Sequence, residues 1–372
     1  MSENQENTDF DLDEDFKNQM PKLRYKWLDE FRGLCVVLYT MAVIAFALSN
    51  DVFLNETPIY PIFYNHGWAL STSFFGHYPG KVPLPITIID LGQVVLMFLV
   101  GILQAHGFKK RLKRSKREAW MYGLNRFSIF LVISVILEDV ILNYGIFIAL
   151  FDGVFCIIAW ATLSAIIATS IIKNPRSRQI FAGFILGIHF ILYMFPSVQN
   201  WSVGEGVWRF QIPWKMINIC AVSIMGTSFE PFLFVERNNG GKKSLKFPKE
   251  MLYFGIICLI GNFILDFVQF SNPLVCNTPL ALFGMSVASF GLFGFFSFSK
   301  IGFSILGLEI IGKNMFIFFL ISPVFEWIFV ESLAPFISNY SLLVLLVFGI
   351  LPIVFLYLCA WLLNKKGILF KI

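Results

Sequence analysis

The sequence predicts an all-α, polytopic integral membrane protein, and two observations support this prediction: the apolar composition and the distribution of basic residues. Of the 372 residues, 57% are apolar and only 14% are charged. The mean hydropathy is +0.71. A soluble protein of this size needs a charged surface that this composition cannot supply, whereas a surrounding bilayer removes that need. We therefore expect helices embedded in lipid.

The apolar residues form runs long enough to cross the hydrocarbon layer, which takes about 20 helical residues. Ten such runs lie near 33–50, 86–107, 119–138, 145–172, 179–196, 214–234, 250–269, 279–299, 312–332 and 341–363. An even number of spans returns the C-terminus to the side on which the chain began. Residues 21–372 are expected to form one membrane domain, and the polar, acidic residues 1–20 a disordered tail.

Basic residues predict the orientation of these spans, because positive charge in short loops is retained on the cytoplasmic side. With the N-terminus inside, the basic runs 109–117, 173–178 and 237–249 all become cytoplasmic. Only Lys81, Arg209 and Lys215, of 29 basic residues, fall on the outer side. Both termini are therefore predicted to be cytoplasmic, and the net charge of +5 is attributed to topology, with no nucleic acid as partner.

The six cysteines show no CxxC motif and no paired spacing. This pattern predicts free thiols and indicates neither a disulfide framework nor a metal site.

Polar side chains within or beside the apolar runs are the candidates for chemistry, because an ionisable group in lipid usually faces a bundle interior or a cavity. The alternative for several of them is a solvated position near a span end. They are Asp90, Gln93, Asn125, Arg126, Asp152, Asn218, Glu230, Asn262, Asp266, Glu309, Asn314 and Glu326. Asp29 and Arg32 are three residues apart, so on a helix they share a face and can pair. Alternatively, they form a helix-start charge pair of little energetic consequence.

The longest predicted outer segment, about 51–85, is rich in aromatic residues and contains His66. An imidazole is largely neutral and nucleophilic near pH 7, so His66 can act as a general base or accept an acyl group. Asp90, at the outer start of the second span, can orient that imidazole. The alternatives are an aromatic belt at the membrane interface around a solvated histidine, and a carboxylate that favours a helix dipole.

A set of short motifs in order along the chain resembles the heparan-alpha-glucosaminide N-acetyltransferase-like family of membrane acyltransferases. The first element is Leu28-Asp29-Glu-Phe-Arg32-Gly33, which resembles the family's L-D-x-x-R-G signature. The others are Tyr60-Pro followed by His66-Gly-Trp68, Thr87-x-x-Asp90 closing on Phe98-Leu-Val-Gly101, Asn125-Arg126, Gly153-Val154, and Ile311-Gly312-Lys313-Asn314.

The resemblance implies acetyl transfer from acetyl-CoA on the cytoplasmic side to a sugar or glycan acceptor, typically an amino sugar, on the outer side. The matched histidine is His66, and Asp90 and Arg126 are matched supporting positions. His77 is a second candidate for the histidine role, because the spacing from His66 to Asp90 is longer than usual in the family. The residues expected to bind the CoA donor are Arg126, Asn125, Lys109, Lys110, Arg111, Asp29 and Arg32. The basic loop 109–117 is also explained by its cytoplasmic position alone.

Two departures from the family keep other functions open. Val43 stands where the family tends to have asparagine, and Cys156-Ile157 stands where a glutamine-arginine pair is expected. The alternatives are a non-enzymatic carrier or flippase for a glycolipid or small solute, and an inactive relative that keeps the fold. Membrane lipid is an expected partner in each case, and association into a homo-oligomer is left open.

Overall fold

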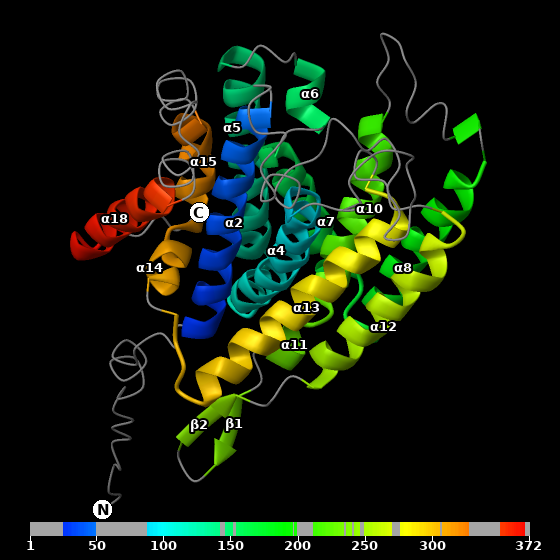
Figure 1. Cartoon of the computed structure of the whole chain (residues 1–372). Coiled ribbons are helices and arrows are strands. Elements are labelled where there is room, and N and C mark those ends of the chain that lie inside the picture. Colours follow the sequence, from blue (N-terminus) through cyan, green and yellow to red (C-terminus); the bar gives the residue numbers. More distant parts are fainter. Residues whose placement is uncertain are drawn as a thin grey trace, which may run out of the picture.

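The chain is represented by a computed structural model, in which the described residues are 25–49, 88–141, 146–151, 154–195, 197–198, 211–233, 236–239, 242–245, 249–269, 276–305, 307–326 and 350–368. Within these ranges the regular structure is helical apart from one short hairpin, so the predicted helical fold class is confirmed (Figure 1). The helices are α2 (Lys26–Ser49), α4 (Ile88–Leu112), α5 (Lys116–Ser134), the π-helix η2 (Val135–Ile141), α6 (Ile146–Phe151), α7 (Val154–Ile171), α8 (Pro175–Tyr193), α10 (Gln211–Thr227), α11 (Glu230–Leu233), α12 (Lys249–Asp266), α13 (Thr278–Lys300), α14 (Leu308–Lys313), α15 (Met315–Glu326) and α18 (Leu351–Lys365).

Each of the predicted apolar runs contains a described helix. Five helical segments are long and apolar enough to cross a membrane. These are Leu91–Leu112, Lys116–Leu137, Ala149–Ile171, Trp214–Leu233 and Thr278–Lys300. The total of ten spans and the cytoplasmic position of both termini stay predictions.

Two tight connections have clear local causes. Ser115 caps α5: its hydroxyl accepts a hydrogen bond from the Glu118 backbone N–H at 3.0 Å, which satisfies a donor at the helix start. Asn174 caps α8 in the same way, with its side chain accepting from the Arg176 N–H at 3.0 Å, and Pro175 begins the helix. Both connections are short, and across the first of them α4 and α5 pack against each other.

Packing of α4 places it at the centre of the helical assembly. It contacts α2, α5, α7, α10 and α13 (Figure 1). Met97, Phe98, Leu99 and Ile102 of α4 are at most 1% exposed. Gly101 allows the close crossing with α10, since a Cβ there would overlap the Ser223 carbonyl oxygen.

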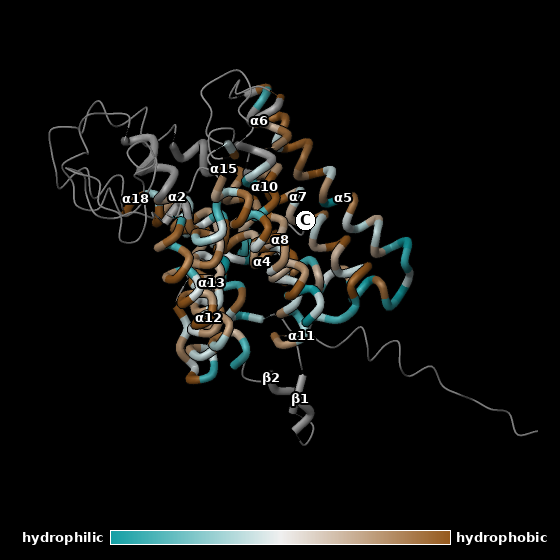
Figure 2. Tube along the Cα trace, turned by 90° about the vertical axis from the view of Figure 1, so that its right-hand side faces the viewer, coloured by the Kyte–Doolittle hydropathy of each residue, from teal (hydrophilic) through white to brown (hydrophobic). Residues whose placement is uncertain are grey.

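The outer faces of several helices expose large apolar side chains. On α8 and α12 these include Ile180, Phe184, Ile257 and Ile264, each more than 60% exposed. Hydrophobic residues run along the helices, and hydrophilic residues gather near the α4–α5 turn (Figure 2). Such extended apolar surface is typical of helices that face lipid.

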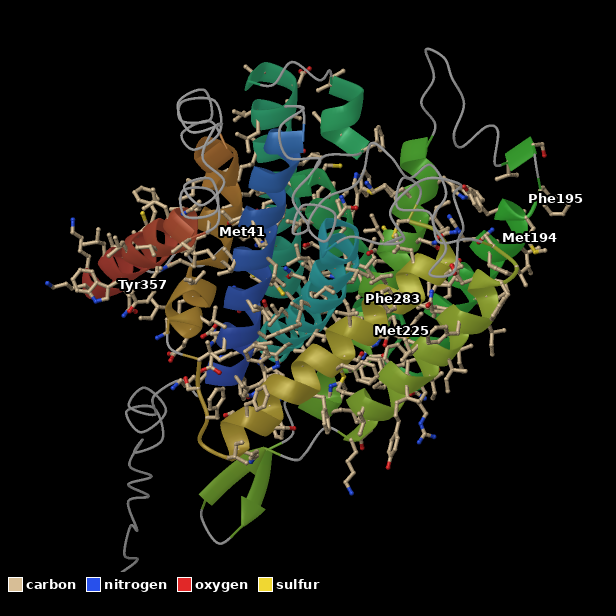
Figure 3. The ribbon with its side chains drawn as sticks, in the orientation of Figure 1. Met41, Met194, Phe195, Met225, Phe283 and Tyr357 are labelled. Carbon is tan, nitrogen blue, oxygen red and sulfur yellow. The ribbon has the colours of Figure 1, made fainter. Side chains whose placement is uncertain are left out.

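Labelled side chains show which parts of the bundle are buried and which lie at its edge (Figure 3). Met225 of α10 is 7% exposed and lies, with Phe283 of α13, toward the centre of the bundle. At the end of α8, Met194 and Phe195 lie at the edge and are 48% and 54% exposed.

A two-stranded hairpin is the exception to the helical prediction. Strands β1 (Glu236–Asn239) and β2 (Lys242–Leu245) pair antiparallel, with Glu236 opposite Leu245. The sequence between them is Gly240-Gly241, and a two-residue glycine connection favours a hairpin. The predicted basic loop 237–249 therefore contains regular structure that the charge pattern did not indicate.

Candidate functional site

The predicted catalytic residues lie at or beyond the limit of the described chain. His66 and His77 lie outside the described residues. Asp90 lies in the first turn of α4, but its side chain is not among those described. The predicted meeting of His66 with Asp90 therefore stays a prediction, and the site is built from the residues matched in the other motifs.

The first motif element forms the start of α2 and is more deeply packed than a surface charge pair. Arg32 Nη1 donates to Asp29 Oδ1 at 3.1 Å, so the predicted pair is present. Asp29 is only 4% exposed. Arg32 Nε also donates to the sulfur of Met315 on α15 at 3.4 Å. Removing one partner from this pair should cost more than removing one from a solvated pair, because it would leave the Asp29 carboxylate buried without its guanidinium.

The first and last motif elements contact each other through two glycines. A Cβ on Gly33 of α2 would overlap the Leu308 carbonyl oxygen of α14. A Cβ on Gly312 of α14 would overlap the Asp29 carbonyl oxygen of α2. The backbones of α2 and α14 are thus close enough to exclude any larger residue at both positions. Leu28-Asp29-Glu-Phe-Arg32-Gly33 and Ile311-Gly312-Lys313-Asn314, far apart in sequence, form one helix crossing.

Further polar contacts surround this α2–α14 crossing. Glu30, which is 2% exposed, accepts a hydrogen bond from the Ser304 hydroxyl. Glu309 pairs with Lys313 at 2.6 Å and with Lys26 at 3.8 Å. The crossing is therefore held by charges on both helices as well as by close backbone packing.

The predicted CoA-binding cations on α4 point in different directions. Lys109 Nζ forms an ion pair with Glu230 Oε2 of α11 at 2.6 Å. Arg111 turns toward α5, where its guanidinium lies 3.5 Å from the centre of the Tyr122 ring. Lys110, between them, is exposed. Residues two apart on a helix face different sides, so Lys109 and Arg111 serve separate clusters.

The guanidinium groups of Arg126 and Arg111 both lie near the Tyr122 ring. Arg126 Nη1 donates to the Tyr122 hydroxyl, and its Nε is buried without a hydrogen-bond partner. Arg126 follows the start of α5 by about ten residues, which places it roughly 15 Å along the helix. The neighbouring Asn125 is exposed. Arg111 and Arg126 are thus brought together on one aromatic ring, while Asn125 is directed away from the interior.

A second cluster near Lys109 contains a residue that the sequence reasoning missed. Arg178, in the first turn of α8, is fully buried, and its Nη2 donates to the Thr227 carbonyl at 3.1 Å. His106 Nδ1 lies 3.4 Å from Glu230 Oε1. Arg178 had been grouped with the basic run 173–178 as a cytoplasmic charge. A usable signal was its helical register: Arg178, Ala182, Leu186, His189 and Tyr193 form one buried face of α8.

His189 begins a third polar cluster at the other end of α8. Its ring stacks on Trp214 at 4.5 Å between centroids. Asn218 Nδ2 lies 3.1 Å from His189 Nδ1 and donates to the Cys276 carbonyl at 2.7 Å. With Asn218 as the donor, His189 Nδ1 is the acceptor of this bond and the ring is neutral. This cluster joins α8, α10 and the segment before α13.

The described ranges contain no group of three or more His, Cys, Asp or Glu side chains that could hold a metal ion. The arrangement instead offers guanidinium and ammonium groups for an anion, and a neutral imidazole among aromatic rings. Compared with models of known protein families, the sequence matches none, and no curated protein matches it.

Proposed function

We propose that this chain is a membrane acyltransferase of ten spans with both termini cytoplasmic, which moves an acetyl group from cytoplasmic acetyl-CoA to a sugar or glycan acceptor on the outer side. The observation that carries the proposal is the α2–α14 crossing. Two motif elements that suggested the acyltransferase resemblance contact each other through Gly33 and Gly312. This contact supports the proposal because it brings the two elements into one part of the structure.

The topology in this proposal has its own support. Five described helical segments are long and apolar enough to cross a membrane, and several other helices expose large apolar side chains. The cations Lys109, Arg111 and Arg178 lie near helix ends that the charge distribution assigns to the cytoplasmic side. A donor as anionic as CoA would be attracted to that side.

In the proposed reaction His66 is the base and Asp90 orients it. The imidazole takes a proton from the acceptor amine or hydroxyl, whose N or O attacks the acetyl carbonyl carbon. The thioester C–S bond breaks, and the proton passes to the leaving thiolate, which gives free CoA and the acetylated acceptor. In a second route His66 first accepts the acetyl group and then passes it to the acceptor. Arg126, Arg111 and Lys109 are the proposed donor-binding residues, together with the Asp29–Arg32 pair.

The test is transfer of labelled acetyl from acetyl-CoA by the purified full chain, with a panel of amino and hydroxyl sugars. His66→Ala should abolish transfer, and His77→Ala, the matched control, should retain it. The reverse result would assign the role to His77. Label retained on the protein in the absence of acceptor would indicate the acyl-histidine route. No transfer to any acceptor by the folded protein would contradict the proposal.

A non-enzymatic carrier or flippase is the second candidate, and one observation favours it. Arg178 and His189 lie on the same buried face of α8, about 11 residues and roughly 16 Å apart. Polar groups spaced along one interior face are typical of a transport path. Transport of a glycolipid or small solute that survives His66→Ala would support the carrier, whereas loss of acetyl transfer in that variant would support the enzyme.

A further inference from the structure

Arg178 is the largest fully buried side chain in the described part of the chain, and most of its hydrogen-bonding capacity is unused. A guanidinium carries five N–H donors. The Thr227 carbonyl accepts from Nη2, whereas Nε and Nη1 have no partner. A buried cation with unsatisfied donors is costly, because water is excluded and no acceptor replaces it. The site therefore favours a ligand that carries negatively charged oxygen atoms.

The carboxylate nearest to this cluster does not balance its charge. Glu230 is close enough for its charge to act on Arg178. The same carboxylate pairs with Lys109 Nζ at 2.6 Å and contacts His106 Nδ1 at 3.4 Å. Among the described residues, the single Glu230 carboxylate thus interacts with two permanent cations and a histidine.

The first turn of α8 adds to this positive potential. Its residues include Arg176 and Arg178 and no acidic residue. The N-terminus of a helix carries a partial positive charge, which usually attracts an acidic side chain. Here an arginine is buried at that position instead, so the helix end and the guanidinium attract an anion together.

The cluster also extends from the surface to the interior. The side chains of His106 and Lys109 are 38% and 32% exposed, whereas Arg178 is fully buried. Lys109 can therefore meet an anion from solvent, whereas the unused Arg178 donors lie in the interior.

We propose that Arg178 and Lys109 bind a phosphate group at the basic end of α4 and α8. Phosphate has several acceptor oxygens and as many as two negative charges, which suits the free Arg178 donors and the Lys109 ammonium. Arg178 is new to the donor-binding residues proposed above, whereas Lys109 is one of them, so for the phosphate of CoA this proposal rests on the proposed function. The phosphate can belong to a soluble nucleotide such as CoA or to the headgroup of an anionic lipid.

The test measures thermal unfolding of the purified full chain in neutral detergent with added CoA, pantetheine or inorganic phosphate. CoA should raise the unfolding midpoint and pantetheine, which lacks phosphate, should not, since a ligand that binds only the folded state stabilises it. In a parallel arm, the chain is placed in nanodiscs of phosphatidylcholine with or without phosphatidylglycerol. Stabilisation by CoA assigns a soluble phosphate, and stabilisation by phosphatidylglycerol alone assigns a lipid headgroup.

Matched variants connect this signal to the proposed residues. Arg178→Gln should abolish the stabilisation, and Lys109→Gln should weaken phosphate binding by roughly tenfold, the loss of one charge-assisted bond. Arg176→Gln removes an exposed cation from the first turn of α8 and should leave the stabilisation unchanged. If Arg178→Gln does not fold, Arg178→Lys and the comparison of Lys109→Gln with Arg176→Gln test whether the stabilisation depends on the proposed residues.

Two outcomes would overturn the proposal. One is a folded wild-type chain that no phosphate-bearing probe stabilises. The other is stabilisation that depends equally on Lys109 and Arg176, because this would indicate attraction by net surface charge. Both outcomes differ from failure of the acyltransferase proposal, which is measured by label transfer.

Discussion

The α2–α14 crossing and the Arg178 cluster both contain buried charge, but their charges are balanced differently. At the crossing, three carboxylates, Asp29, Glu30 and Glu309, face three cations, Lys26, Arg32 and Lys313. In the Arg178 cluster, the contacts of the described residues give one carboxylate, Glu230, which interacts with Lys109, His106 and Arg178.

This difference separates two uses of a buried charge. A balanced set with close backbone packing holds helices together even when no ligand is bound. An unbalanced set keeps unused donors, and those donors favour an anion from outside the chain. Substitutions at the crossing should therefore change mainly the stability of the fold, and substitutions at the Arg178 cluster should change mainly ligand binding.

The largest effect is expected from Gly312→Val, because its side chain would overlap the Asp29 carbonyl oxygen and force α2 and α14 apart. We expect a loss of about 3 kcal/mol or more of folding free energy, or no folded protein. Fluorescence-detected size-exclusion chromatography after heating measures this. The control Gly294→Ala lies on α13, where no heavy atom is within 4 Å of the added Cβ. Unfolding at the wild-type midpoint in Gly312→Val would contradict the close crossing.

Removal of one partner from the Asp29–Arg32 pair should have an intermediate effect. Arg32→Ala leaves a carboxylate that is 4% exposed without its guanidinium. Because the Arg32 side chain is itself 24% exposed, we expect a modest cost of about 1–3 kcal/mol. The double variant Asp29→Asn/Arg32→Ala should recover part of it. Thermal unfolding of Arg32→Ala, Asp29→Asn and the double variant gives a double-mutant cycle, which measures the interaction energy of the pair.

The surface pair Arg114–Glu118 provides the control for that cycle. Its side chains are 69% and 42% exposed. Arg114→Ala should change stability by less than about 0.5 kcal/mol. Equal effects of Arg32→Ala and Arg114→Ala would mean that burial of Asp29 adds nothing, and the contrast between a packed crossing and a solvated pair would fail.

The smallest effect is expected from Glu230→Gln, and it concerns binding. Removing this carboxylate frees Lys109 and leaves Arg178 with more uncompensated charge. Phosphate affinity should rise by roughly threefold to tenfold, or about 1 kcal/mol, and should fall as salt is added. Glu309→Gln at the balanced crossing should create no phosphate binding. Equal affinity in Glu230→Gln and the wild-type chain would show that charge imbalance does not control this site.

Prediction from the sequence was most successful where the signal is local. Each apolar run contains a helix, because apolar length and composition act along the chain itself. The spacing of Asp29 and Arg32 also predicted their pair, since residues three apart share a helix face. Helix α2 begins at Lys26, before the apolar run expected near residue 33, so Asp29 and Arg32 lie on it as expected. Charges in those first turns are accommodated by Ser304 and Glu309, which lie far away in sequence.

The candidate sites were predicted only in part. The sequence pointed to Lys109, Arg111 and Arg126 as one group, but Lys109 pairs with Glu230 while the two arginines share Tyr122. Arg178 was read as a loop charge, because a cytoplasmic position explains any basic residue near a span end. Its burial depends on α10, whose Thr227 carbonyl meets it.

Composition and charge pattern by themselves determined that this chain forms apolar helices with basic residues gathered at their ends. Those properties follow from solvent preference and local spacing, which need no knowledge of neighbours. Only the tertiary structure decided which charges are balanced. That outcome depends on which helices cross, and glycines such as Gly33 and Gly312 allow crossings so close that residues distant in sequence share one buried environment.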